Sequence, residues 1–179
     1  MYKEVIKIPN ALHSLFKLSC LQLNTHLSQQ NDEQTLEVRN CSRLCLWCIQ
    51  FEGNTQVQSE LVSARYAGLL AIAISTASGQ GEEQDKEINQ GLVRISEFLK
   101  ELRKGRNNNN SSFQPLPMLA KRSEEQIEEE GGIEEVDAQL INNGEVYEFF
   151  KYNNIEDKAK ITKRSMMNCF INSSNKNPK

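Results

Sequence analysis

The sequence predicts an all-α fold of about seven helices. Apolar residues recur at spacings of three and four along the 179-residue chain, whereas the alternation typical of strands is almost absent. Only 7% of the residues are aromatic, which suits a core of Leu, Ile and Ala side chains packed between helices. The length fits one domain or a short run of helical repeats, and it is too short for a complete (β/α)8 barrel.

The first two helices are predicted from the residues at their ends. An amphipathic segment follows Pro9 and continues to Leu27, with its apolar residues on one stripe. Asp32 lies where an acidic side chain favours the start of a helix, and Gly53 lies where glycine commonly ends one. A second helix is therefore expected between these two residues.

The third helix is expected from about Thr55 to Ala77. It becomes apolar on all sides after Tyr66, which predicts a position in the centre of the domain. A fourth helix follows, with acidic residues at 82–85 and basic residues at 100–106, as the helix dipole favours. Its predicted core stripe consists of Ile88, Leu92, Ile95, Leu99 and Leu102.

The sequence divides into four segments. Residues 1–106 form a predicted helical repeat segment, and the Asn/Ser-rich residues 107–114 are expected to form an exposed loop. Residues 115–171 are expected to hold a further helix pair and a C-terminal helix, and residues 172–179 a disordered tail. The three predicted helices of this last part cover residues 115–130, 133–140 and 155–171.

Composition favours a cytoplasmic protein without a nucleic-acid partner. The chain has 21 Lys and Arg residues against 24 Asp and Glu residues, so it lacks the basic excess of a nucleic-acid-binding domain. It contains neither a signal-peptide pattern nor the roughly 20 apolar residues that a membrane span needs. Five cysteines, an odd number, without a secretory signal predict reduced thiols.

One cysteine motif resembles a known catalytic pattern. Cys41, Cys45 and Cys48 have the C-x3-C-x2-C spacing of the cluster-binding motif of radical S-adenosylmethionine enzymes, in which three thiolates hold a [4Fe–4S] cluster. That family places its cysteines on a loop after a strand, whereas here they lie within a helical pattern. The same spacing also marks one face of a helix, where cysteine is commonly buried. We therefore interpret the three cysteines as core residues, with an iron–sulfur enzyme as the alternative function.

Charge divides the C-terminal half of the chain. An acidic block at residues 124–137 precedes a last helix that carries Lys158, Lys160, Lys163 and Arg164. Such runs are commonly solvated surfaces. The other interpretations are attraction between neighbouring helices, steering of a charged protein partner or, less favoured because no aromatic residues are interleaved, an RNA-binding surface.

The segments Leu61–Ile74, Leu92–Leu99 and Pro115–Leu140 have Leu, Ile and small residues at helical spacing. In this pattern, residues from about Ala11 to Leu140 resemble an armadillo-type helical repeat protein. The resemblance implies a right-handed α-solenoid of helix pairs, and a compact helical bundle is the alternative architecture. It also implies a non-enzymatic scaffold that binds a partner protein along a helical face. We expect no catalytic residue, no metal and no cofactor.

Overall fold

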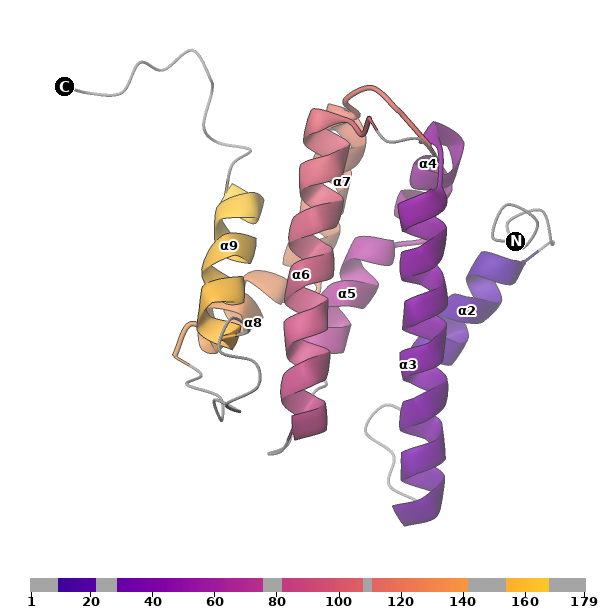
Figure 1. The fold of residues 1–179 in the computed structure, drawn as a ribbon, viewed down its shortest axis with the longest axis vertical. Helices are drawn as coiled ribbons and strands as arrows, with labels where there is room; N and C mark the ends of the chain where they lie inside the picture. The colour runs from indigo at the N-terminus through magenta and orange to yellow at the C-terminus, as the bar shows by residue number, and fades with distance from the viewer. Residues whose placement is uncertain (1–9, 22–28, 76–81, 108–110, 142–153, 168–179) are drawn as a thin grey trace.

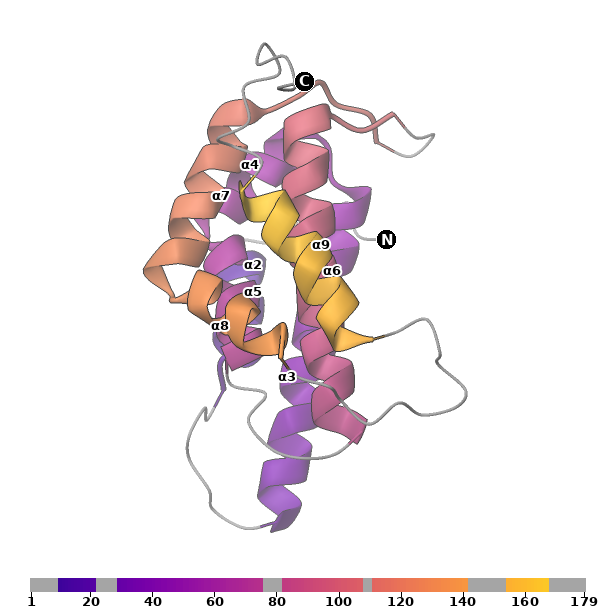
Figure 2. The same cartoon turned by 90° about the vertical axis from the view of Figure 1, so that its left-hand side faces the viewer.

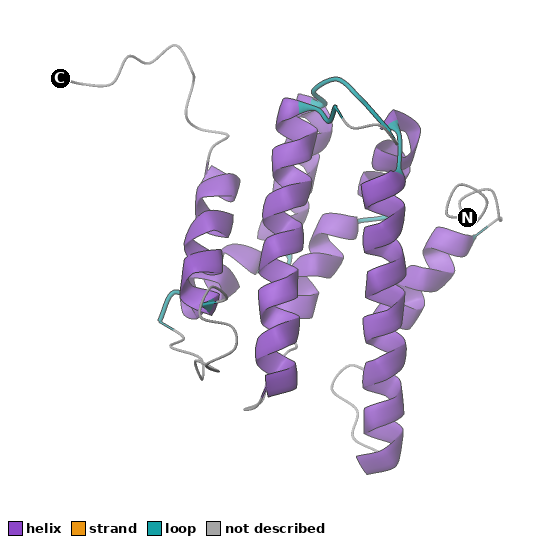
Figure 3. Cartoon of the chain, viewed as in Figure 1, coloured by secondary structure: helices purple, strands orange, loops and turns teal. Residues whose placement is uncertain are grey.

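The computed structural model describes residues 10–21, 29–75, 82–107, 111–141 and 154–167 (Figure 1). All regular elements in these ranges are helices, apart from one isolated antiparallel bridge between Arg106 and Phe113 (Figure 3). The predicted all-α class is therefore confirmed. The helices are α2 (Ala11–Ser19), α3 (Gln29–Glu52), α4 (Thr55–Ser63), α5 (Tyr66–Ser75), α6 (Glu82–Lys104), α7 (Pro117–Glu129), α8 (Gly132–Gln139) and α9 (Ile155–Met167).

The helices form two layers. Helices α3, α6 and α9 lie in a row in one layer, and the remaining helices lie behind them (Figures 1 and 2). Neighbours in the row run in the same direction, because contacts along each pair advance together in sequence. Arg43 of α3 pairs with Glu87 of α6, and Gln50 of α3 donates to Glu101 of α6. The Thr162 hydroxyl of α9 donates to the Leu92 carbonyl of α6, and Arg103 of α6 donates to the Ser165 carbonyl of α9.

Helix α5 lies at the centre of the core, as its apolar sequence predicts. Eight of its ten residues are buried, and α5 contacts α2, α4, α6, α7 and α8. The five predicted core residues of α6 are also buried, with exposures of 5% for Ile88 and 0% for the other four. Gly91 of α6 allows the close approach of α5, since a Cβ atom there would lie 2.7 Å from Ile74.

The prediction of one continuous third helix is wrong, because the structure has two helices, α4 and α5, in that range. Helix α4 ends at Ser63, α5 begins at Tyr66, and Arg65 between them has a left-handed φ of 65°. A side chain other than glycine is strained there. The Arg65 guanidinium lies 2.8 Å from a Glu129 carboxylate oxygen and 3.0 Å from one of Glu130, beside the end of α7. These contacts favour the break, which the apolar periodicity does not reveal.

The expectation of an exposed loop over residues 107–114 is also wrong in part. Ser111 and Phe113 are buried, at 9% and 6% exposure. Phe113 exchanges two backbone hydrogen bonds of 2.9 Å with Arg106. Gly105, at φ 74°, supplies the left-handed turn that ends α6 and starts this pairing. Residues 108–110, 172–179 and the ends of the predicted first, third and last helices lie outside the described ranges.

Tyr66 provides a test of the core. It is 1% exposed and its ring meets Phe98 edge to face at 5.1 Å, yet its hydroxyl has no hydrogen-bond partner among the described residues. Burial raises the pKa of this phenol. Because an unpaired buried hydroxyl costs free energy, Tyr66→Phe should raise the free energy of unfolding by about 1 kcal/mol in urea denaturation. A loss of similar size would mean that the hydroxyl is hydrogen-bonded.

Candidate interaction surface on helix α3

Helix α3 has an unusually polar inner face. Only two of its large buried side chains, Leu46 and Ile49, are apolar. The other buried side chains of α3 can hydrogen-bond or carry charge, which is uncommon for a helix that packs on a core. They are Thr35, Ser42, Arg43 and Gln50.

The opposite side of α3 is apolar and exposed. We call Val38, Cys41, Leu44, Cys45 and Phe51 the outer face of α3. Leu44 is 48% exposed, Phe51 41% and Val38 38%, and both cysteines are exposed. No exposed residue of α3 between Cys41 and Phe51 carries a charge. Glu37 and Asn40 are also exposed on this side, so the outer face is apolar mainly from Cys41 to Phe51. Several exposed apolar residues on one side of a helix are more informative than a single one, because larger exposed apolar patches commonly bind other molecules.

Two aromatic rings lie where α3 meets α6. The half-buried Trp47 stacks on Phe51, with ring centroids 5.6 Å apart. The Arg94 guanidinium of α6 lies 6.0 Å from the centroid of the Trp47 ring. Tryptophan and arginine are the residue types that most often dominate binding energy at protein interfaces. The arrangement therefore places two such residues beside an apolar surface.

The cysteines do not face the core as the sequence analysis expected. Cys41, Cys45 and Cys48 do lie in a helix, but Cys41 and Cys45 are exposed and Cys48 is half-buried. Partial burial, together with the neighbouring Cys48 and Cys41, raises the pKa of Cys45, so its thiol stays protonated at neutral pH. Within the described ranges, no three His, Cys, Asp or Glu side chains are arranged to hold a metal ion.

A buried ion pair fixes the middle of α3 against α6. Arg43, 3% exposed, pairs through Nη1 with the Glu87 carboxylate, while its Nε and Nη2 atoms have no hydrogen-bond partner within the described part of the chain. Burial lowers the pKa of Arg43 to about 10, with a further contribution from the positive charge of Arg39. A guanidinium held this way is costly without its carboxylate.

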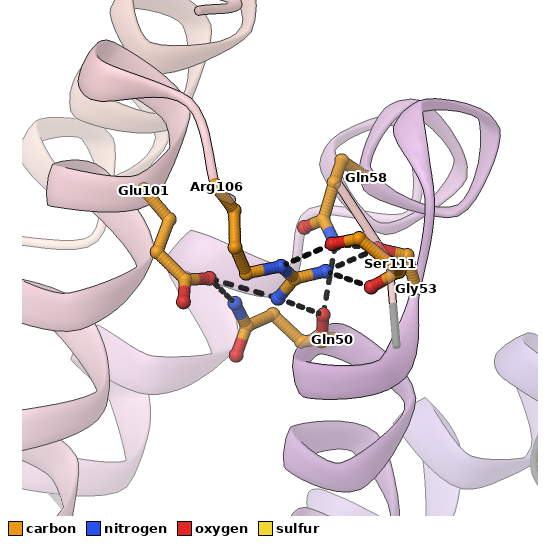
Figure 4. Close-up of polar contacts among 6 residues, drawn as sticks. All are labelled: Gln50, Gly53, Gln58, Glu101, Arg106 and Ser111. Atoms are coloured by element: carbon orange, nitrogen blue, oxygen red, sulfur yellow. Dashed lines mark hydrogen bonds and ion pairs between the residues drawn. The ribbon is translucent and has the colours of Figure 1, made fainter. Parts of the chain in front are cut away.

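Arg106 fixes the C-terminal end of α3 (Figure 4). Its Nη1 donates to the Gln50 carbonyl and to a Glu101 carboxylate oxygen, both at 3.1 Å. Its Nη2 donates to the Gly53 carbonyl and, at 2.7 Å, to the Ser111 hydroxyl. Its Nε donates to the Ser111 carbonyl at 3.0 Å. All five N–H groups of the guanidinium are therefore satisfied.

Two further side chains complete this cluster, which we call the Arg106 cluster. Gln58 of α4 donates to the carbonyls of Gln50 and Gly53, at 2.8 and 3.0 Å. The Gln50 side chain donates to Glu101 at 2.5 Å. Burial raises the pKa of Glu101, and Arg106 opposes that shift. The cluster thus binds the last carbonyls of α3 to α4, α6 and the segment after α6. Sequence reasoning missed it, since a single arginine after Gly105 gives no motif.

The charge division of the C-terminal half is partly explained by contacts between helices. Lys163 of α9 lies 2.7 Å from Asp137 of α8, and Arg103 of α6 pairs with Glu124 of α7. The first contact is an attraction between the acidic block and the last helix, and the second holds the block to α6. Other members of the block, such as Glu125, Glu128 and Glu134, are exposed.

The Arg106 cluster predicts a large effect of a conservative substitution. Arg106→Lys keeps the charge but cannot satisfy three carbonyls, the Glu101 carboxylate and the Ser111 hydroxyl together, so the free energy of unfolding should fall by about 2–4 kcal/mol in urea denaturation. Arg122→Lys, on the exposed side of α7, is the matched control and should change it by less than about 0.5 kcal/mol. Equal effects of the two substitutions would contradict the assigned role of Arg106.

The ion pair of Arg43 predicts a non-additive result. Glu87→Gln alone leaves a buried charge without its counter-ion and should destabilise the protein by about 3 kcal/mol. Adding Arg43→Met removes that charge and should restore stability to the wild-type value or above it. A double variant that stays less stable than the wild type would show that the ion pair is a net stabilising contact.

None of the helices in the described ranges is long and apolar enough to cross a lipid bilayer. Comparison of the chain with protein-family models, with curated proteins and with solved structures found no match.

Proposed function

We propose that this chain is a non-enzymatic scaffold that binds a partner protein through the outer face of α3 and the adjoining rings of Trp47 and Phe51. The observation that carries the proposal is the mixed polarity of α3, which buries Arg43 and Gln50 beside Leu46 and Ile49. The same helix exposes Leu44 and Phe51. A helix that served only the core would bury its apolar side. The exposed side is best explained by a partner that covers it.

An armadillo-like right-handed α-solenoid is part of this proposal, with a compact helical bundle as the alternative. Its support is a recurrence in helix order: a long helix followed by two shorter ones occurs as α3, α4, α5 and again as α6, α7, α8. The next helix, α9, joins α3 and α6 in one row (Figure 1). Stacked units of this kind bury in common the apolar faces that each unit would expose alone.

The partner is expected to present apolar side chains to α3. Leu44, Phe51 and Trp47 lie on a single helix, so we expect an interface smaller than the roughly 800 Å² per partner of a standard interface. The expected dissociation constant is therefore on the order of micromolar. A cytoplasmic location remains part of the proposal, because the exposed thiols of Cys41 and Cys45 suit a reducing compartment.

Substitution of one exposed leucine tests the proposal. Leu44→Glu should reduce the capture of specific partners in quantitative proximity labelling at least about tenfold. The reason is that the introduced charge must be desolvated when the partner binds. Met118→Glu, at a 75% exposed position on α7, is the matched control and should leave capture unchanged. Both variants should keep the wild-type melting temperature within a few degrees, since neither residue is buried. Equal capture by all three proteins would refute the proposed surface.

The iron–sulfur alternative remains a prediction of the cysteine motif. Anaerobic reconstitution with iron and sulfide, followed by iron analysis and visible absorption, tests it with Cys45→Ser as the control. A colourless, iron-free protein would remove this alternative.

A further inference from the structure

Two thiols lie next to each other on the outer face of α3. Cys41 and Cys45 are both exposed, and neither forms a disulfide. They are four residues apart in a continuous helix, which places their Cβ atoms about 5–6 Å apart on one side of it. Cys48 follows one turn later but is half-buried. The outer face therefore presents one pair of accessible thiols.

The spacing of this pair is too wide for a disulfide. A disulfide needs Cβ atoms about 3.5–4.5 Å apart, so joining Cys41 to Cys45 requires the backbone of α3 to move. Contacts with the rest of the fold oppose such a movement. Arg43, between the two cysteines, pairs with Glu87 of α6, and Gln50 further along α3 donates to Glu101. The pair is therefore held in the dithiol form.

One metal ion can join the two sulfur atoms where a direct bond cannot. A metal–thiolate bond is about 2.3 Å long, as at zinc, so two sulfur atoms on opposite sides of one ion lie about 4.6 Å apart. Rotation of the Cys41 and Cys45 side chains can reach that separation without movement of the backbone, because their Cβ atoms are a similar distance apart. The geometry of the pair thus suits an ion held between two ligands.

The surroundings of the pair decide which ion fits. Within the part of the chain that the structure describes, no three His, Cys, Asp or Glu side chains are arranged to hold one ion. Zinc takes three or four protein ligands, and iron–sulfur clusters commonly take four. The exposed neighbours Val38 and Leu44 are apolar and offer no ligand atom. Two soft thiolates without a further ligand favour monovalent copper.

We infer that Cys41 and Cys45 bind one monovalent copper ion as a two-coordinate dithiolate. Binding forms two copper–sulfur bonds and releases both thiol protons to solvent, so one cation and two thiols give a complex with one negative charge and two protons. No oxidation state changes. The site departs from the expectation that the chain holds no metal. It is independent of the proposed function, because the ion binds the chain without a partner protein.

Competitive titration tests the site. The full chain is titrated with monovalent copper against a coloured chelator of that ion, without oxygen and without added thiols. One ion should bind per chain. Cys41→Ser and Cys45→Ser should each weaken binding at least about a hundredfold, because a hydroxyl does not replace a thiolate at a soft ion. Cys20→Ser, at a half-buried thiol after α2, is the control and should bind as the wild type does.

A matched variant separates this site from binding by any two thiols. Asn40→Cys combined with Cys41→Ser keeps the number of thiols but places the pair five residues apart, about 140° around the helix. Its affinity should fall as in Cys45→Ser, and wild-type affinity would overturn the inference in favour of adventitious binding. Cys48→Ser should keep the wild-type affinity, and a loss as large as in Cys41→Ser would overturn the two-ligand assignment. X-ray absorption at the copper edge should show two sulfur neighbours.

Discussion

The placement of α3 depends on a buried guanidinium. Arg106 follows α6 in sequence, yet its side chain binds the last carbonyl groups of α3, the Glu101 carboxylate and Ser111. The carbonyls at the end of a helix have no partner within the helix, and an arginine side chain satisfies them while its charge favours the negative end of the helix dipole. Without this cluster, the junction between α3 and α4 would bury unpaired carbonyls.

A seam of polar contacts extends from the Arg106 cluster along α3 and α6. Glu87, Arg94 and Glu101 of α6 are spaced by seven residues, which places them on one side of the helix. Their partners on α3 are Arg43, Trp47 and Gln50. Because these contacts occupy part of the inner side of α3, Leu46 and Ile49 are its only buried apolar side chains among the described residues, and the five residues of the outer face are exposed. The same constraint therefore explains how α3 is held and why it exposes an apolar surface.

The sequence alone predicts the apolar core well and the polar seam poorly. The stripe from Ile88 to Leu102 and the central position of α5 follow from periodicity, because burial of apolar area is independent of exact partners. Polar contacts such as Arg106 with Gly53 join residues more than 50 positions apart and depend on atomic geometry. The same limit explains the incorrect burial expected for Cys41 and Cys45. Their spacing identifies one side of a helix, but only the tertiary contacts decide which side is buried.

The seam has a consequence for how this chain can change over time. Glu87 and Gln50 each lie inside a contact that fails when one member is replaced alone, whereas Leu92 tolerates another apolar residue of similar volume. Substitutions at 43 and 87, and at 50, 101 and 106, are therefore expected to occur together. A future alignment of relatives should show correlated variation at these positions and independent variation along the core stripe of α6.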